Sequence, residues 1–183
     1  EAARQTAAHS TLTIDDVSSC RIAHASGIER VVAGQIVAGP TQIGLKRETL
    51  AEGALLDLSH DGYAQRFGLI HERRVALKSD GAQLVGEDRL TAASTAAQTA
   101  PQTFALRFHV HPSVSAMHAG EETAVVLDLP DGQRWMFDAG GLPVALEESV
   151  FFASPDGARA CQQIVVTGKA EAGAEVQWAL SRL

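Results

Sequence analysis

Short runs of alternating apolar and polar residues dominate this sequence and constrain its fold more than any other feature. In the run 104–110, apolar side chains at alternate positions share one face, while Arg107 and His109 share the other. Alternation of period two over this length is typical of a strand with one buried face. We expect further strands at 10–14, 53–59, 66–77, 84–90, 123–129, 133–137, 142–152, 161–168 and 175–183.

Turn residues separate these runs, and helical periodicity is nearly absent. Asp-Gly pairs lie at 61–62, 80–81, 131–132 and 156–157, each between apolar runs. The stretch 91–102 lacks a bulky apolar stripe and ends near Pro101, so we predict an exposed loop there. Hairpins without helical crossovers imply antiparallel sheets, and each sheet must bury one face. The prediction is an all-β fold, an antiparallel multi-sheet β-sandwich with residues 1–183 as one domain.

Composition excludes several classes of function. The formal net charge of −7 disfavours nucleic-acid binding, because phosphate contacts need clustered Lys and Arg. No apolar run is long enough for a membrane span, and no secretory signal pattern is present. Cys20 and Cys161 could form one disulfide, but we favour unpaired structural cysteines. Residues 1–10 show no strand or turn pattern and begin with Glu1, so we expect the domain to continue from an upstream segment.

Two histidines on one predicted strand are candidate metal ligands. His109 and His111 would project from the same face about 7 Å apart, a spacing that suits one metal ion. His60 or His71 could supply a third ligand. The alternative is that these imidazoles only form hydrogen bonds across a polar sheet face, and we favour it because no carboxylate follows at a fixed spacing.

Tyr63, the only tyrosine, is a candidate general acid or base. Arg66, Arg73 and Arg74 lie near enough in sequence to lower its pKa. The alternative interpretation, which we favour, is a tight turn at Asp61 with Tyr63 capping the core. The adjacent acidic pairs at 15–16 and 147–148 would point to opposite strand faces, so they are not paired acid and base carboxylates.

Four segments, in this order along the chain, together resemble the C-terminal part of the heparinase II/III-like polysaccharide lyases. The first is similar to the family pattern T-x-x-H-N-T-x-x-V-D, with Ser10 where the family usually has Asn. The second is similar to H-D-G-Y followed by G-x-x-H-x-R-R. The segments are TAAHSTLTID at 6–15, HDGY at 60–63 with GLIHERR at 68–74, GEDRL at 86–90 and RFHVHP at 107–112.

The resemblance implies an N-terminal α/α toroid followed by this sandwich, in an enzyme that cleaves uronic-acid polysaccharides by β-elimination. A base removes the proton alpha to the carboxylate, and an acid protonates the leaving glycosidic oxygen. The groups that do this lie in the toroid or in an upstream G-H-x-H motif, so no catalytic residue is assigned here, and Tyr63 does not match the catalytic tyrosine. In the relatives that have a metal, the matching histidine is one of several zinc ligands, and here only His9 is present, so the full parent could hold zinc and none is expected in this piece.

The same resemblance implies that the partners are the toroid of the parent chain and an acidic polysaccharide, in the periplasm or cell envelope. The expected function is that of an accessory sandwich, inactive by itself. A second hypothesis is a non-catalytic carbohydrate-binding sandwich, although aromatic residues are only 5% of the chain. A third is a cupin-like metal enzyme using His109 and His111, whose usual following Glu is missing.

Overall fold

The computed structural model describes residues 2–23, 31–93, 102–120 and 122–183, and these form antiparallel sheets. The larger sheet has eight strands, and a second sheet has four. The order in the larger sheet is β4 (Ile43–Leu50), β5 (Gly53–His60), β6 (Leu69–Lys78), β7 (Gln83–Ala92), β14 (Glu175–Arg182), β11 (Arg134–Asp138), β10 (Ala124–Asp128) and β9 (Ser115–His118). The order in the second is β1 (Leu12–Ile14), β8 (Thr103–His109), β13 (Arg159–Lys169) and β12 (Ala145–Phe151).

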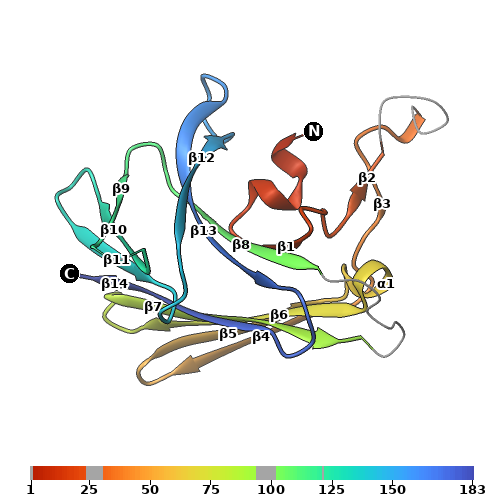
Figure 1. Ribbon diagram of the computed structural model, residues 1–183, viewed down its shortest axis with the longest axis horizontal. Helices are drawn as coiled ribbons and strands as arrows, with labels where there is room; N and C mark the ends of the chain where they lie inside the picture. The colour runs from red at the N-terminus through yellow and green to blue at the C-terminus, as the bar shows by residue number, and fades with distance from the viewer. Residues whose placement is uncertain (1, 24–30, 94–101, 121) are drawn as a thin grey trace.

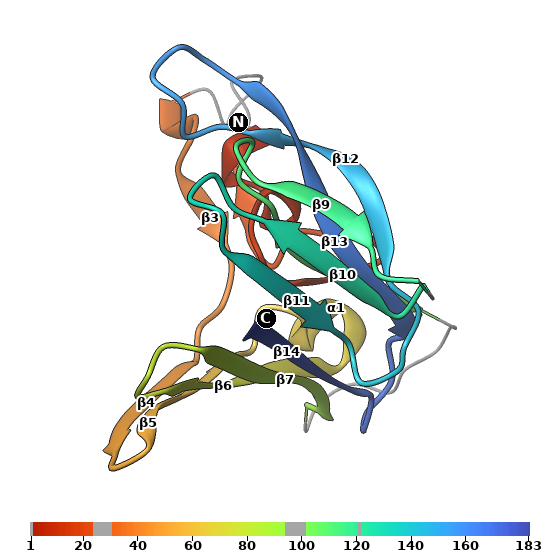
Figure 2. The ribbon, with the colours of Figure 1, turned by 90° about the vertical axis from the view of Figure 1, so that its left-hand side faces the viewer.

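The smaller sheet lies over the middle of the larger one. The larger sheet runs below it and curves upward through β11, β10 and β9 (Figure 1). Seen from the side, β4 and β5 extend beyond the part that the smaller sheet covers (Figure 2). The 3-10 turns η1 (Ala2–Arg4) and η2 (Thr6–Ala8) lie against β1 on its far side from the larger sheet (Figure 1). A short ribbon of β2 (Arg21–Ile22) and β3 (Ile36–Ala38) stands apart.

Apolar side chains from both sheets fill the space between them. Leu12 and Leu106 come from the smaller sheet, while Leu90, Phe137 and Trp178 come from the larger one, and all are buried. Alternation also places three polar residues of the larger sheet on this inner face. They are His71 and Arg73 on β6 and Asp88 on β7, and Arg73 is the cross-strand partner of Asp88.

The structure confirms the predicted all-β, antiparallel multi-sheet sandwich, including the hairpin of β10 and β11 around the turn at 131–132. Predicted strand ends differ from the observed ones by up to three residues, as at β12, which is expected from Leu142 and begins at Ala145. The strand expected from Arg66 instead begins at Leu69, because the short helix α1 (Ala64–Phe67) precedes it. Gly68 ends α1 at φ 69°, a left-handed conformation that suits glycine.

Sequence reasoning missed four strands and the N-terminal turns. β4 is exposed along most of its length, so its residues carry no apolar alternation, while β2, β3 and β9 are short. Residues 2–8, expected to lack structure, form the 3-10 turns η1 and η2. Of the loop predicted at 91–102, residues 94–101 lie outside the described part, and Thr91 and Ala92 belong to β7. Cys20 and Cys161 are not bonded to each other.

Candidate functional site

The four segments singled out in the sequence meet at one place between the sheets. Asp88 of β7 is at the centre, with a fully buried side chain. Its Oδ1 accepts hydrogen bonds of 2.7 Å from His71 Nε2 and from Arg73 Nε, and its Oδ2 accepts one of 2.8 Å from Trp178 Nε1. Burial alone would raise the pKa of Asp88, but the bond from His71 and the charge of Arg73 outweigh it and keep the pKa below its ordinary value. Asp88 is therefore a buried carboxylate anion.

A chain of hydrogen bonds leads outward from Asp88 through two histidines. His71 Nδ1 lies 3.3 Å from His60 Nε2, and His60 Nδ1 accepts the backbone N–H of Gly62 at 3.2 Å. Because His60 Nδ1 accepts, its Nε2–H must donate to His71 Nδ1, and His71 Nε2–H then donates to Asp88. Both imidazoles are satisfied in the neutral form. Burial and the neighbouring His71 accordingly lower the pKa of His60 to about 4.

Tyr63 caps the core and has no features of a general base. Its side chain is buried, and its hydroxyl donates a hydrogen bond of 2.8 Å to the Leu12 carbonyl. Burial raises the pKa of Tyr63, so the interpretation in which nearby arginines lower that pKa is wrong. Arg73 is paired with Asp88 and Arg74 with Asp57, which leaves neither of them directed at the phenol.

Arg73 and His109 hold the backbone on both sides of His9. On the N-terminal side, His109 Nε2 donates to the Ala7 carbonyl at 3.0 Å. On the C-terminal side, Arg73 Nη1 donates to the Ser10 carbonyl at 2.7 Å, and the His109 N–H donates to Ser10 Oγ at 3.0 Å. Because Ser10 accepts through its side chain, the Ser found here in place of the family's Asn has a defined role. Residues from β6 and β8 thus fix the segment that carries His9.

His9 itself has a fixed backbone and an exposed side chain. Its N–H donates to the Thr6 carbonyl at 3.1 Å, and its carbonyl accepts the Thr11 N–H at 2.9 Å. The imidazole is exposed and has no hydrogen-bond partner among residues 2–23, 31–93, 102–120 and 122–183. Such a side chain can ligate a metal or another group from outside this chain.

The described residues do not complete a zinc site around His9. No group of three His, Cys, Asp or Glu side chains among them is placed to hold one metal ion. A structural zinc site needs about four ligands, so His9 can be no more than one of them.

His109 and His111 do not form the metal pair considered from the sequence. His109 Nδ1 accepts from Ser149 Oγ at 3.0 Å while its Nε2 donates to Ala7, so both ring nitrogens are used. His111 lies beyond the end of β8, and its Nδ1 is 2.7 Å from Ser113 Oγ. His60 bonds to His71, and His71 bonds to Asp88, instead of approaching this pair. The arrangement supports hydrogen bonding across the sheet face.

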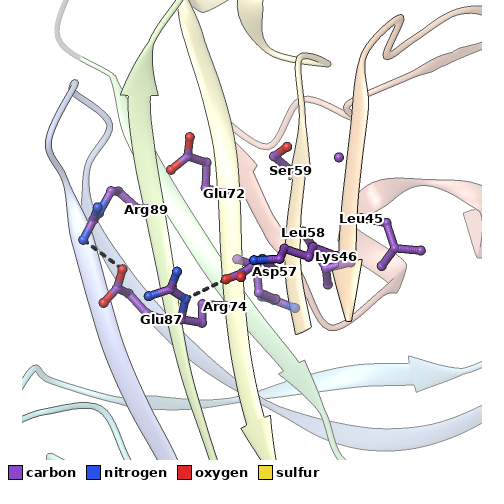
Figure 3. A pocket seen from close by; sticks show the side chains of 11 residues that line it. Leu45, Lys46, Asp57, Leu58, Ser59, Glu72, Arg74, Glu87 and Arg89 are labelled. Atoms are coloured by element: carbon purple, nitrogen blue, oxygen red, sulfur yellow. Dashed lines mark hydrogen bonds and ion pairs between the residues drawn. The ribbon is translucent and has the colours of Figure 1, made fainter. Parts of the chain in front are cut away.

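A hollow of about 410 Å³ on the outer face of β4 to β7 is charged but internally neutralised. Its charged side chains at Asp57, Arg74, Glu87 and Arg89 lie on the sheet face opposite to that of Arg73 and Asp88, and Arg74 meets Asp57 while Arg89 meets Glu87 (Figure 3). Lys46 contacts Glu48 in the same way. Because each cation that lines this hollow has a carboxylate partner, the hollow does not present the uncompensated positive charge that a sulfated or uronic-acid polymer would require.

Sequence reasoning missed Asp88 and Trp178 as members of the central cluster. The available signal was alternation in β7, where Asp88 shares a face with Leu84, Gly86 and Leu90. A carboxylate at an apolar-face position needs partners, because an unpaired buried charge is strongly disfavoured. Those partners come from β6 and β14, and the sequence does not indicate that pairing.

A family model described as "Heparinase II/III-like, C-terminal" matches residues 1–179. The chain belongs to this family. The C-terminal heparinase-like domain described here is 32% identical, over 96% of its length, to the FtsZ-localized protein C of Caulobacter vibrioides, and it spans only 31% of that protein. No helix in the described part of the domain is long and apolar enough to cross a membrane.

Two solved lyases share the fold of this heparinase-like domain. One is the heparan sulfate lyase HepC from Pedobacter heparinus, with a TM-score of 0.71 and 16% identity over 98% of this chain. Another is the heparinase III product BT4657, with a TM-score of 0.68 and 14% identity over 98% of this chain. The domain corresponds to 24% of each of those chains.

Proposed function

We propose that this domain is the accessory β-sandwich of a polysaccharide lyase that cleaves uronic-acid polymers by β-elimination. Family membership and the fold shared with two heparan-degrading enzymes support the proposal. The acid and base that move protons would come from an α/α toroid in the same parent protein. The acidic polysaccharide would then contact mainly the toroid, in keeping with the paired charges on the outer face of β4 to β7.

The observation that carries this proposal is the way His9 is held. Three buried or half-buried residues from distant parts of the chain, Tyr63, Arg73 and His109, make four hydrogen bonds to the segment 7–12 and leave the His9 imidazole exposed. A side chain that only contributes to stability does not need a backbone fixed on both sides and a free ring. We propose that His9 is one zinc ligand in the parent protein, with the remaining ligands outside this chain. The zinc would be structural, joining this sandwich to the rest of the enzyme in the cell envelope.

The experiment is a lyase assay on the full-length protein with heparan sulfate and alginate as substrates. β-Elimination produces an unsaturated uronate, which is followed by its ultraviolet absorbance. His9→Ala is compared with His118→Ala, a matched change of an exposed histidine on β9. We expect His9→Ala to lower both the bound zinc and the activity, and His118→Ala to leave both unchanged. Full zinc content in His9→Ala contradicts the assignment of this ligand, and product from residues 1–183 alone contradicts an accessory role.

A second candidate function follows from the curated relative. This domain is 32% identical to the FtsZ-localized protein C and 16% identical to HepC, and the name of the first protein places it at FtsZ. The domain would then serve a protein whose location depends on FtsZ, with or without lyase activity. Co-sedimentation of the full-length protein with FtsZ filaments, together with no unsaturated product from any uronic-acid polymer, would favour this candidate.

A further inference from the structure

An apolar cavity of about 500 Å³ lies between the two sheets, next to the Asp88 cluster. Phe108 of β8 faces Phe137 and Trp178 of the larger sheet, with ring centroids 4.8 Å apart in both pairs. Trp135 and Leu84 line the same space. A volume of this size is in the range of small-molecule sites, and such sites are mostly apolar with a few polar groups.

Two polar groups at this cavity, on Arg73 and His111, offer hydrogen-bond donors. Nη2 of Arg73 is buried and has no hydrogen-bond partner within the described residues, and the guanidinium Cζ lies 6.0 Å from the centre of the Phe108 ring. His111, which is exposed and also lines the cavity, accepts the Ser113 N–H on Nδ1. Its Nε2 therefore carries the proton of the neutral ring. An occupant that supplies an acceptor oxygen would satisfy an otherwise unpaired donor.

Charge balance decides which acceptor fits. Arg73 is already neutralised by Asp88, whose side chain is fully buried, so the cavity wall carries no net positive charge. A carboxylate entering this apolar space would lose its hydration without gaining a free counter-ion. An uncharged carbonyl oxygen can accept from Arg73 without that penalty.

We propose that this cavity binds an uncharged molecule with an aromatic or similarly flat apolar body and one carbonyl oxygen. The body packs against the contacting rings of Phe108, Phe137 and Trp178 that line the cavity, and the oxygen accepts from Arg73 Nη2 after a small shift of the Phe108 ring. His9 does not line this cavity, and the proposal does not depend on lyase activity.

The test compares three probes of matched size on the full-length protein by saturation-transfer NMR and calorimetry. 2-Acetylnaphthalene has the apolar body and the carbonyl, 2-ethylnaphthalene lacks the oxygen, and 2-naphthoate carries a charge. We expect saturable binding of 2-acetylnaphthalene and about tenfold weaker binding of each of the other two, which is the effect of one hydrogen bond or one desolvated charge. Equal binding of 2-ethylnaphthalene, or tighter binding of 2-naphthoate, overturns the proposed chemistry.

A cavity-filling variant locates the site. Leu84→Trp places an indole in the cavity, while Leu45→Trp makes the same change on β4 at a side chain that is 71% exposed and outside the cavity. We expect Leu84→Trp to weaken 2-acetylnaphthalene binding by about tenfold or more, and Leu45→Trp to leave it within about twofold. If Leu84→Trp does not fold, Leu180→Phe, at another lining position, gives the same comparison. Undiminished binding in the folded cavity-filling variant, or no binding to the unmodified protein, overturns the proposal.

Discussion

The Tyr63 hydroxyl donates a hydrogen bond of 2.8 Å to the carbonyl of Leu12, a residue 51 positions earlier in the chain. Leu12 opens β1, the edge strand of the smaller sheet, and Tyr63 immediately precedes α1, which leads into β6 of the larger sheet. The bond therefore joins the two sheets close to the segment that carries His9. Since both residues are buried, water cannot replace either partner.

Tyr63→Phe removes this donor and leaves the buried Leu12 carbonyl without the hydrogen bond from the phenol. We expect the free energy of unfolding to fall by about 1–3 kcal/mol, measured by urea denaturation. Thr167→Val, which deletes an exposed hydroxyl on β13, is the matched control and should change stability by less than about 0.5 kcal/mol. Equal stability of Tyr63→Phe and the unmodified protein would mean that the bond contributes nothing.

Asp88→Asn tests the buried cluster. The change removes the negative charge that compensates Arg73. It also replaces the carboxylate that accepts the hydrogen bond from Trp178 Nε1 with an amide. We expect a loss of about 3–5 kcal/mol, the usual result of breaking a buried ion pair on one side. Asp57→Asn, at the exposed pair with Arg74, should cost less than about 1 kcal/mol. Similar losses in the two variants would show that burial does not set the strength of the Asp88 interactions.

The stability of the protein should fall as the pH drops from about 6.5 to 4. His60 has a pKa of about 4 in the folded protein and 6.5 as its ordinary value, so the unfolded chain binds the proton first. Above pH 6.5 the imidazole is neutral in both states, and the folded protein has its full stability. As the pH falls from 6.5 to 4, the proton binds to the unfolded chain in preference to the folded one, and this stability is lost. With allowance for partial exposure, the change is about 2–3 kcal/mol.

His60→Asn removes this titration and should flatten the decline in urea denaturation experiments at pH 7, 5.5 and 4.5. His109, whose pKa is lowered chiefly by burial, contributes in the same direction and remains in that variant. The pKa of Asp88 is lowered from its ordinary value of 3.8, since the bond from His71 and the charge of Arg73 outweigh burial, so its stabilising effect is lost mainly below this pH window. An unchanged pH dependence in His60→Asn would contradict the neutral form of His60 in the folded state.

Gly86→Ala tests a close approach inside the larger sheet. A Cβ at Gly86 would overlap the Trp178 indole, which packs on Phe108 and donates to Asp88. We expect overpacking to cost about 1–3 kcal/mol and to alter the near-ultraviolet dichroism of Trp178. In Gly44→Ala, on β4 of the same sheet, the new Cβ would meet only the Ser59 side chain, which can rotate away. A smaller effect at Gly86 than at Gly44 would contradict this packing.

The strand pattern could be predicted wherever one face of a strand is buried. β8 alternates clearly, β10 and β11 are short apolar runs on either side of the turn at 131–132, and the predicted positions of all three agree with the structure. β4 could not be found in this way, because an exposed edge strand has no buried face to impose alternation. The strand predicted at 66–77 includes the last two residues of α1, because a helix of four residues is too short to show a helical period before Gly68 ends it.

Of the candidate site, the sequence supplied the segments and the tertiary structure supplied their roles. His9, Tyr63, Arg73 and His109 were all singled out from the sequence, yet neither the bond from Arg73 to Ser10 nor that from His109 to Ala7 could be inferred. Local periodicity determines which side chains face inward, because that choice depends on neighbours two positions away. Strand order and register decide which inward groups meet, and these depend on pairings between residues as distant as Asp88 and Trp178, which only the folded chain brings together.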